Sequence, residues 1–107
     1  MASTPIRAAG PALVSNAAAT KYTVPAVSKF VLRHIHVQNP TASPVDFTLS
    51  IGADAAGTRL FDGYPIGPDS TLSVWVYKVL EAAEVIQAFA GTNNVVTLTL
   101  NGDLRTL

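Results

Sequence analysis

The sequence predicts an all-β protein, a single antiparallel β-sandwich of jelly-roll-like form with an extended N-terminal arm. From residue 21 to residue 102, short segments of alternating apolar and polar residues follow one another, with turn residues between each pair. Strands at such regular spacing are typical of a sandwich or a jelly-roll-like barrel and not of βαβ units. We therefore expect an arm over residues 1–20 and one sandwich domain over residues 21–107.

The arm is rich in alanine, serine, threonine, proline and glycine, and its only sizeable apolar residues are Ile6, Leu13 and Val14. By itself such a segment cannot bury enough surface to offset its ordering entropy. Two interpretations stay open. One is a frayed terminus, and the other is an extended arm that orders against a neighbouring subunit and pairs through residues 13–15.

The longest expected strand covers residues 30–39 and ends at an Asn-Pro pair. Side chains alternate across a strand, so this segment divides into two faces. One face is expected to hold Val31, Arg33, Ile35 and Val37, and the other Phe30, Leu32, His34 and His36.

Residues 45–53 show the clearest two-faced pattern. Phe47, Leu49 and Ile51 point one way and polar residues the other, as in an antiparallel strand with one solvated face. A helix is the alternative over residues 79–87, but the apolar residues there favour a strand. The later strands are expected at residues 58–61, 71–78, 85–90 and 95–100, with irregular extended chain at 64–68 and a short edge strand at 104–107.

The segment 71–77 is apolar on both faces, although a strand of a two-layer sandwich has only one buried face. Trp75 and Tyr77 share the outer face. Three explanations stay open: cover by the chain itself, contact with another protein, or a platform on which sugar rings stack. We place Trp75 and Tyr77 in a partner interface, together with Leu13 and Val14 of the arm.

Composition excludes several functions. Only 13% of the residues are charged, about half the usual share, which favours a surface that other subunits partly cover. The formal net charge is zero and basic residues stand singly, so we expect neither nucleic acid nor a membrane as partner. There is no cysteine, no signal-peptide core and no stretch of about 18 apolar residues. We expect synthesis in a cytoplasm, followed by assembly there.

The pair His34 and His36 is the one weak candidate for metal binding. Side chains two residues apart project from the same face of a strand, so both imidazoles would reach one ion. No third ligand follows at motif spacing, although a trimer would bring six nitrogens to its axis. The alternative is a polar pair on an outer face. No catalytic or cofactor-binding motif occurs, so we expect no cofactor and no enzyme.

The order of several short motifs resembles a family of small β-sandwich proteins from the virions of tailed bacteriophages. The motifs are Tyr-Thr-Val-Pro-Ala at 22–26, Phe-Thr-Leu-Ser-Ile-Gly at 47–52, Leu-Glu-Ala-Ala-Glu-Val-Ile at 80–86 and Thr-Leu-Thr-Leu-Asn-Gly at 97–102. The likeness covers everything except the arm. One departure is Ala83-Glu84, where Gly-Asp is usual and glycine would relieve backbone strain.

The resemblance implies a non-enzymatic virion protein in multiple copies, a minor tail or tail-tip protein in preference to capsid decoration. It would dock onto other virion proteins through its arm and one sheet face, as a homo-oligomer and in one arrangement a trimer. A carbohydrate-binding module that recognises host-surface glycans through Trp75 and Tyr77 is the alternative. No catalytic residues follow from the resemblance.

Overall fold

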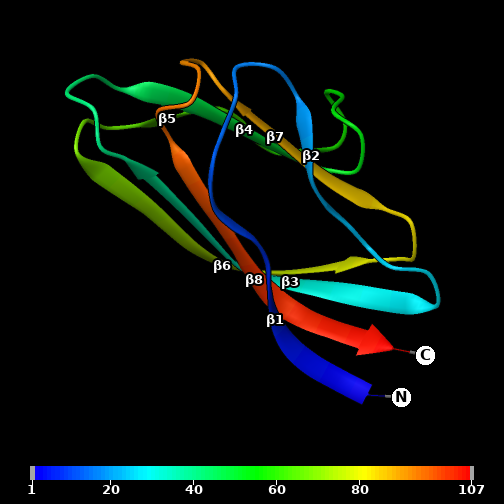
Figure 1. Ribbon diagram of the computed structural model, residues 1–107. Helices are drawn as coiled ribbons and strands as arrows, with labels where there is room; N and C mark the ends of the chain where they lie inside the picture. Colours follow the sequence, from blue (N-terminus) through cyan, green and yellow to red (C-terminus); the bar gives the residue numbers. More distant parts are fainter. Residues whose placement is uncertain (1, 107) are drawn as a thin grey trace.

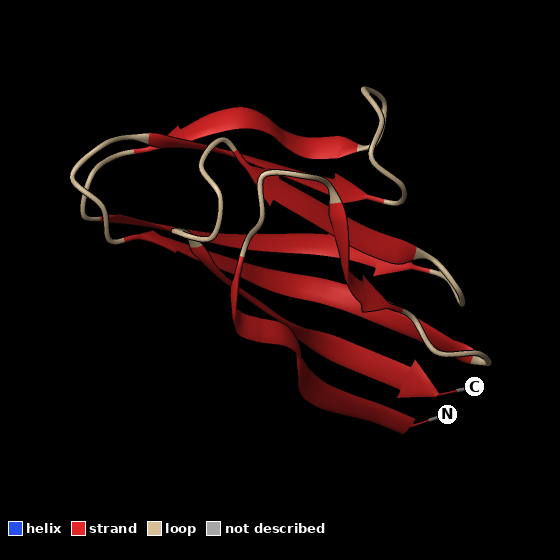
Figure 2. Cartoon of the chain, turned by 45° about the horizontal axis from the view of Figure 1, so that its top comes forward, coloured by secondary structure: helices blue, strands red, loops and turns tan. Residues whose placement is uncertain are grey.

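The computed structural model describes residues 2–106, and their regular secondary structure is entirely β-strand (Figure 1; Figure 2). No helix in this part of the chain is long and apolar enough to cross a membrane. The strands are β1 (Ala2–Leu13), β2 (Ala19–Thr23), β3 (Ser28–Asn39), β4 (Val45–Ile51), β5 (Arg59–Ile66), β6 (Ser70–Leu80), β7 (Val85–Ala90) and β8 (Thr97–Thr106).

The strands form two four-stranded antiparallel sheets. Sheet A has the order β1-β8-β3-β6, and sheet B has the order β2-β7-β4-β5. Strand β1 pairs with β8, β2 with β7, β3 with β6 and β4 with β5, which is the pattern of one long hairpin rolled onto itself. This topology is an eight-stranded jelly roll. The predicted all-β, jelly-roll-like sandwich is therefore confirmed.

The hydrophobic core lies between the two sheets, where the inward side of every strand contributes. Strands β7 and β8 alternate between buried and partly exposed residues, as expected for strands with one face inward. The largest fully buried side chains include Phe30, Phe47, Leu32, Ile35, Leu49, Leu80, Ile86, Leu98 and Leu100.

A bulge in β3 changes the expected division of its faces. Residue Leu32 pairs with Gly102 of β8, but the next pair is His34 with Asn101, so β3 contains one extra residue. As a result Arg33 and His34 both face outward. The core receives Phe30, Leu32, Ile35 and Val37, not the alternating set that the sequence predicted.

The N-terminal segment forms a strand in the same chain. Residues 2–13 are β1, which pairs with β8 along the edge of sheet A, and the expected boundary at residue 20 falls inside β2. Close backbone packing requires glycine at position 10, where φ is 81° and a Cβ atom would overlap the Leu98 carbonyl oxygen. Met1 lies outside the described residues.

Several strand boundaries also differ from prediction. Tyr64 and Pro65 belong to β5 and are not irregular chain, and residues 104–106 extend β8, while Leu107 lies outside the described residues. Residues 85–90 form a strand, as the sequence favoured over a helix. The polar face of β4 is covered, because Thr48 accepts a hydrogen bond from Gly63 (2.9 Å) and Ser50 donates one to Asp54 (2.8 Å).

Candidate functional site

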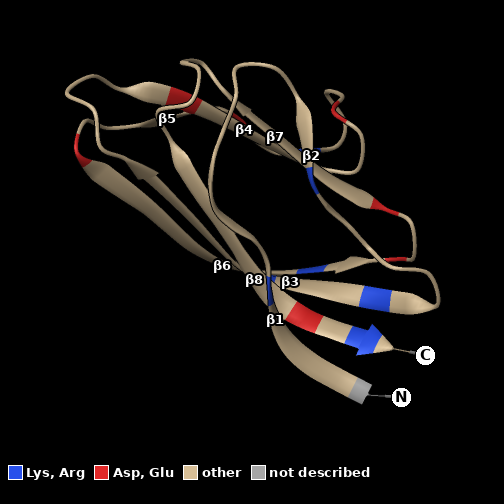
Figure 3. Ribbon diagram, viewed as in Figure 1, with Lys and Arg blue, Asp and Glu red and all other residues tan. Residues whose placement is uncertain are grey.

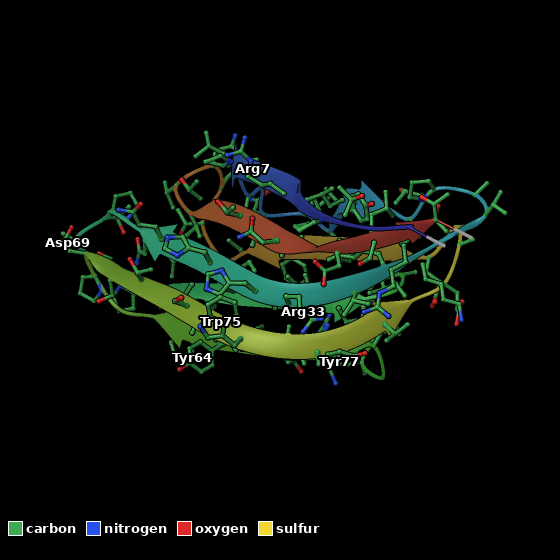
Figure 4. The ribbon with its side chains drawn as sticks, turned by 90° about the horizontal axis from the view of Figure 1, so that it is seen from below. Arg7, Arg33, Tyr64, Asp69, Trp75 and Tyr77 are labelled. Carbon is green, nitrogen blue, oxygen red and sulfur yellow. The ribbon has the colours of Figure 1, made fainter. Side chains whose placement is uncertain are left out.

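Four outward-facing residues, one from each strand of sheet A, form a single row across the strands. Trp75 of β6 pairs with His34 of β3, His34 pairs with Asn101 of β8, and Asn101 pairs with Arg7 of β1. We call these four residues the transverse row. Figure 4 shows this face, with Arg7 at the β1 side and Trp75 at the β6 side.

The transverse row lies in an open groove of about 410 Å³ on the outer face of sheet A. Arg33 and Asp103 also line the groove, as do Pro5 and Ile6 of β1. The volume falls within the usual range of small-ligand sites, and an aromatic ring with a few convergent polar groups is typical of them.

Trp75, at the aromatic end of the groove, packs against His34, which Ser73 holds in turn. The Trp75 and His34 ring centroids are 4.5 Å apart, and His34 Nε2 shares a hydrogen bond of 2.7 Å with Ser73 Oγ. Trp75 is nevertheless 79% exposed, so its outer ring face is free for a ligand or a partner. An exposed, braced indole favours recognition over a purely structural role.

The charges of this face are unevenly neutralised. Five of the seven basic residues lie on strands of sheet A, so the residues that stand singly in sequence gather in space (Figure 3). Arg33 pairs with Asp103 at 3.1 Å and lies over the Tyr77 ring at 5.3 Å. Lys29 pairs with Glu81 at 3.5 Å. Among residues 2–106, Arg7 forms no ion pair.

The two histidines lie on the same outer face, with ring centroids 6.2 Å apart. His34 is held by Ser73, whereas His36 lies one row further along, opposite Ser73 and Thr99. In the part of the chain that the structure describes, no group of three or more His, Cys, Asp or Glu side chains could hold a metal ion. A shared metal between copies remains a prediction.

The four expected interface residues differ in accessibility. Trp75 and Tyr77 are 79% and 60% exposed on β6, and Leu13 is 54% exposed at the end of β1. Val14 is fully buried, and its backbone bonds Val96 and Asn94, so a partner reaches it only if this segment moves. Val79, also exposed on β6, extends the apolar surface beyond the residues that the sequence indicated.

A second charged cluster fixes the loop between β4 and β5. Arg59 contacts Asp54 at 3.0 Å and Asp62 at 2.9 Å. The hydrogen bond from Arg59, followed by that from Ser50, holds the pKa of Asp54 below its ordinary value. The hydrogen bond to Asp54 in turn raises the pKa of Arg59. The charges and hydrogen-bonding groups of Arg59, Asp54 and Asp62 are paired with one another, so we regard the cluster as structural.

No known protein family matches this chain, and no curated protein matches it significantly. Among solved structures, the chain is similar to a protein of the Bacillus endospore appendages, which form disulfide-linked pili, with a TM-score of 0.53 and 14% identity over 99% of this chain and 86% of that one. At this identity the likeness shows a shared fold alone.

A pentameric capsid protein isolated from metagenomic phage sequences, solved twice, aligns more weakly. Its TM-score is 0.37 in both cases, at 14% and 15% identity, over 87% of this chain and 58% and 59% of those chains. A likeness this weak carries no argument about the present chain.

Proposed function

We propose that this chain is a non-enzymatic structural protein of a bacteriophage particle, present in multiple copies and docked onto the tail or the capsid surface. The sequence resemblance favours a minor tail protein over capsid decoration. The contacts with neighbouring proteins run through the free edge of sheet A at β6 and through the N-terminal segment near Leu13.

The observation that carries this proposal is the long edge strand β6, which has little protection against pairing with another chain. Sheet edges present unpaired backbone groups, and soluble proteins usually blunt them with charge, proline or short length. Strand β6 has 11 residues and no proline, and its only protection is one charge, Lys78, and one register shift beside Tyr77. It exposes Tyr77 and Val79. The other three edges carry such protection: β1 has Pro5, Pro11 and two register shifts, β5 has Pro65, and β2 has only five residues.

Composition and fold agree with a subunit of a larger assembly. With 13% charged residues, the chain has fewer surface charges than a soluble lone domain usually carries. Jelly rolls are frequent among capsid proteins, which is support by fold analogy only. The similar appendage protein belongs to disulfide-linked pili, but this chain has no cysteine, so its own contacts would be non-covalent.

Light scattering on β6 variants tests the proposal. We expect the mass of the purified chain to rise with concentration above the monomer value of 11.2 kDa. Tyr77→Glu and Val79→Glu should each shift this association to concentrations at least about tenfold higher, because a buried unpaired charge opposes the contact. Tyr64→Glu, an equally drastic change on sheet B, is the matched control and should leave it unchanged. A chain that stays monomeric up to millimolar concentration, or that responds equally to all three variants, contradicts the proposed edge contact.

A second candidate function is recognition of host-surface glycans, and the groove beside Trp75 favours it. Both functions can occur in one virion protein, and Tyr77 would belong to both surfaces, because it is exposed on β6 beside Trp75. If the chain still binds glycans after both Trp75→Ala and Tyr77→Ala, these two aromatic rings are not the surface on which the sugar stacks.

A further inference from the structure

We infer that the groove on sheet A binds an acidic saccharide that lies across the strands, with a sugar ring on Trp75 and a carboxylate at Arg7. This inference rests on the glycan-binding candidate and is independent of the structural role. It names the ligand class, the direction in which the ligand lies and the residue that selects its charge.

The transverse row sets the length and direction of the site. Trp75 and Arg7 are separated by three interstrand steps, which corresponds to about 14 Å. His34 and Asn101 occupy the two positions between them. A ligand that contacts both ends is therefore longer than one sugar ring and meets polar side chains along its whole length.

Each position of the row matches a part of an oligosaccharide. One face of a sugar ring consists of C–H groups and packs on an exposed indole such as Trp75, which His34 braces at 4.5 Å. The hydroxyl groups on the rim both donate and accept hydrogen bonds. The Asn101 amide and the His34 imidazole also do both, so they can satisfy such a rim.

The charges of the groove indicate a single carboxylate. Two basic residues line the groove. Arg33 is neutralised by Asp103, whereas Arg7 has no acidic partner among the described residues. A guanidinium binds a carboxylate through two parallel hydrogen bonds. Nucleic acid is a poorer fit, because a polyanion needs several unneutralised cations along its path.

A peptide is also a poorer fit to the groove. Extended peptides add to a sheet along its edge, parallel or antiparallel to the strands, and gain main-chain hydrogen bonds there. The transverse row runs perpendicular to the strands on a face whose backbone groups are already paired. A peptide lying in it would leave its own backbone groups dependent on a few side chains.

The intrinsic fluorescence of the whole chain tests the inference, because Trp75 is its only tryptophan. The chain is titrated with an α-1,4-linked trisaccharide of two galactose rings and one galacturonic acid ring and, separately, with the neutral α-1,4-linked galactotriose. We expect a saturable change in Trp75 emission with both, and at least about tenfold tighter binding of the acidic trisaccharide, the strength of one charge-assisted hydrogen-bonded pair.

Two variants with the same change of charge assign the preference. Arg7→Gln should reduce the ratio of acidic to neutral affinity to about one. Lys78→Gln, on β6 but outside the groove, should retain the preference. A broad change in the amide NMR spectrum of Arg7→Gln would show that this variant is misfolded. The test is then the salt dependence of the wild-type chain: added salt should weaken its binding of the acidic trisaccharide and leave its binding of the neutral one unchanged.

The outcomes separate this inference from the functions proposed above. Equal binding of both trisaccharides overturns the acidic specificity and leaves glycan recognition standing. No response in Trp75 emission or in the amide signals of His34 and Asn101 at millimolar sugar overturns both.

Discussion

The side-chain amide of Asn39, the last residue of β3, donates a hydrogen bond of 3.0 Å to the carbonyl oxygen of Ile66, the last residue of β5. This contact joins the two sheets, because β3 belongs to sheet A and β5 to sheet B. The same amide reaches the Ser43 and Gly67 carbonyls, and its oxygen accepts two bonds from Thr41. Asn39 thus acts as a buried polar clamp between two loops.

Replacing Asn39 by alanine should destabilise the fold by about 2 kcal/mol or more, because buried carbonyl groups lose their donor. Asn39→Asp should cost more at neutral pH, since a carboxylate faces those carbonyls without a proton to donate. Urea unfolding measures both effects. The neighbouring exposed residue supplies the control, and Gln38→Ala should change stability by less than about 0.5 kcal/mol. An Asn39→Ala loss no larger than that of the control would refute the clamp.

Ala83 occupies a backbone conformation that favours glycine, with a φ of 69° at the turn between β6 and β7. Its N–H group donates to the Val24 carbonyl at 3.0 Å, so the strained residue is also anchored. Ala83→Gly should therefore stabilise the protein by about 1 kcal/mol. Ala82→Gly, next to it and without a positive φ, should instead lose about 0.5 kcal/mol or more. Thermal unfolding distinguishes the two, and a loss in both variants would show that Ala83 carries no strain.

Gly102 of β8 lies beside β3 in sheet A, where it pairs with Leu32. A Cβ atom there would approach Phe30 Cζ to 2.6 Å and overlap the Val31 carbonyl oxygen. We expect Gly102→Ala to cost about 3 kcal/mol, the upper end of overpacking effects, because backbone must move. Gly57→Ala, which meets nothing within 4 Å, is the control. Unfolding midpoints that agree between the two variants would contradict the close approach of β8 and β3.

Asp54 should make the stability of the protein depend on acid pH. Its pKa is lowered in the folded state, first by the hydrogen bond from Arg59 and then by that from Ser50. The stabilisation is therefore fully present above the unfolded pKa, ordinarily 3.8, and disappears as the pH falls through the lower folded-state value. Asp54→Asn should be less stable than the wild type at neutral pH.

Urea unfolding at pH 7 and at about pH 2.5 measures this dependence, and the difference in stability between wild type and Asp54→Asn should be smaller at the acid pH. The exposed Asp46 of β4 provides the control, since Asp46→Asn should show little difference at either pH. A gap between wild type and Asp54→Asn that persists unchanged at the acid pH would contradict the proposed ion pair with Arg59.

The sequence was sufficient to predict the sandwich because most strands alternate clearly. Residues such as Phe47 and Leu49 mark the inward face of β4 without any knowledge of its partners. Strand β1 escaped prediction because alanine, glycine and proline have weak strand preference, and what orders it is its long-range pairing with β8. Similarly, the bulge at Arg33 depends on the register with β8, which local alternation does not encode.

The groove could be predicted only in part. Trp75 and Tyr77 were visible because apolar residues on both faces of one strand are unusual. Arg7 and Asn101 were not, because they lie near opposite ends of the chain and become neighbours of Trp75 only through the register of four strands. No short-range signal in the sequence connects them.

Reconstruction of the purified particle to which we assign this chain tests the proposed structural role most directly. The account predicts eight-stranded jelly-roll density at repeated positions on the tail or the capsid, with β6 at a protein contact, and stoichiometric amounts of the chain in the particle by mass spectrometry. Intact particles that lack the chain, while it is abundant elsewhere in the infected cell, would contradict it.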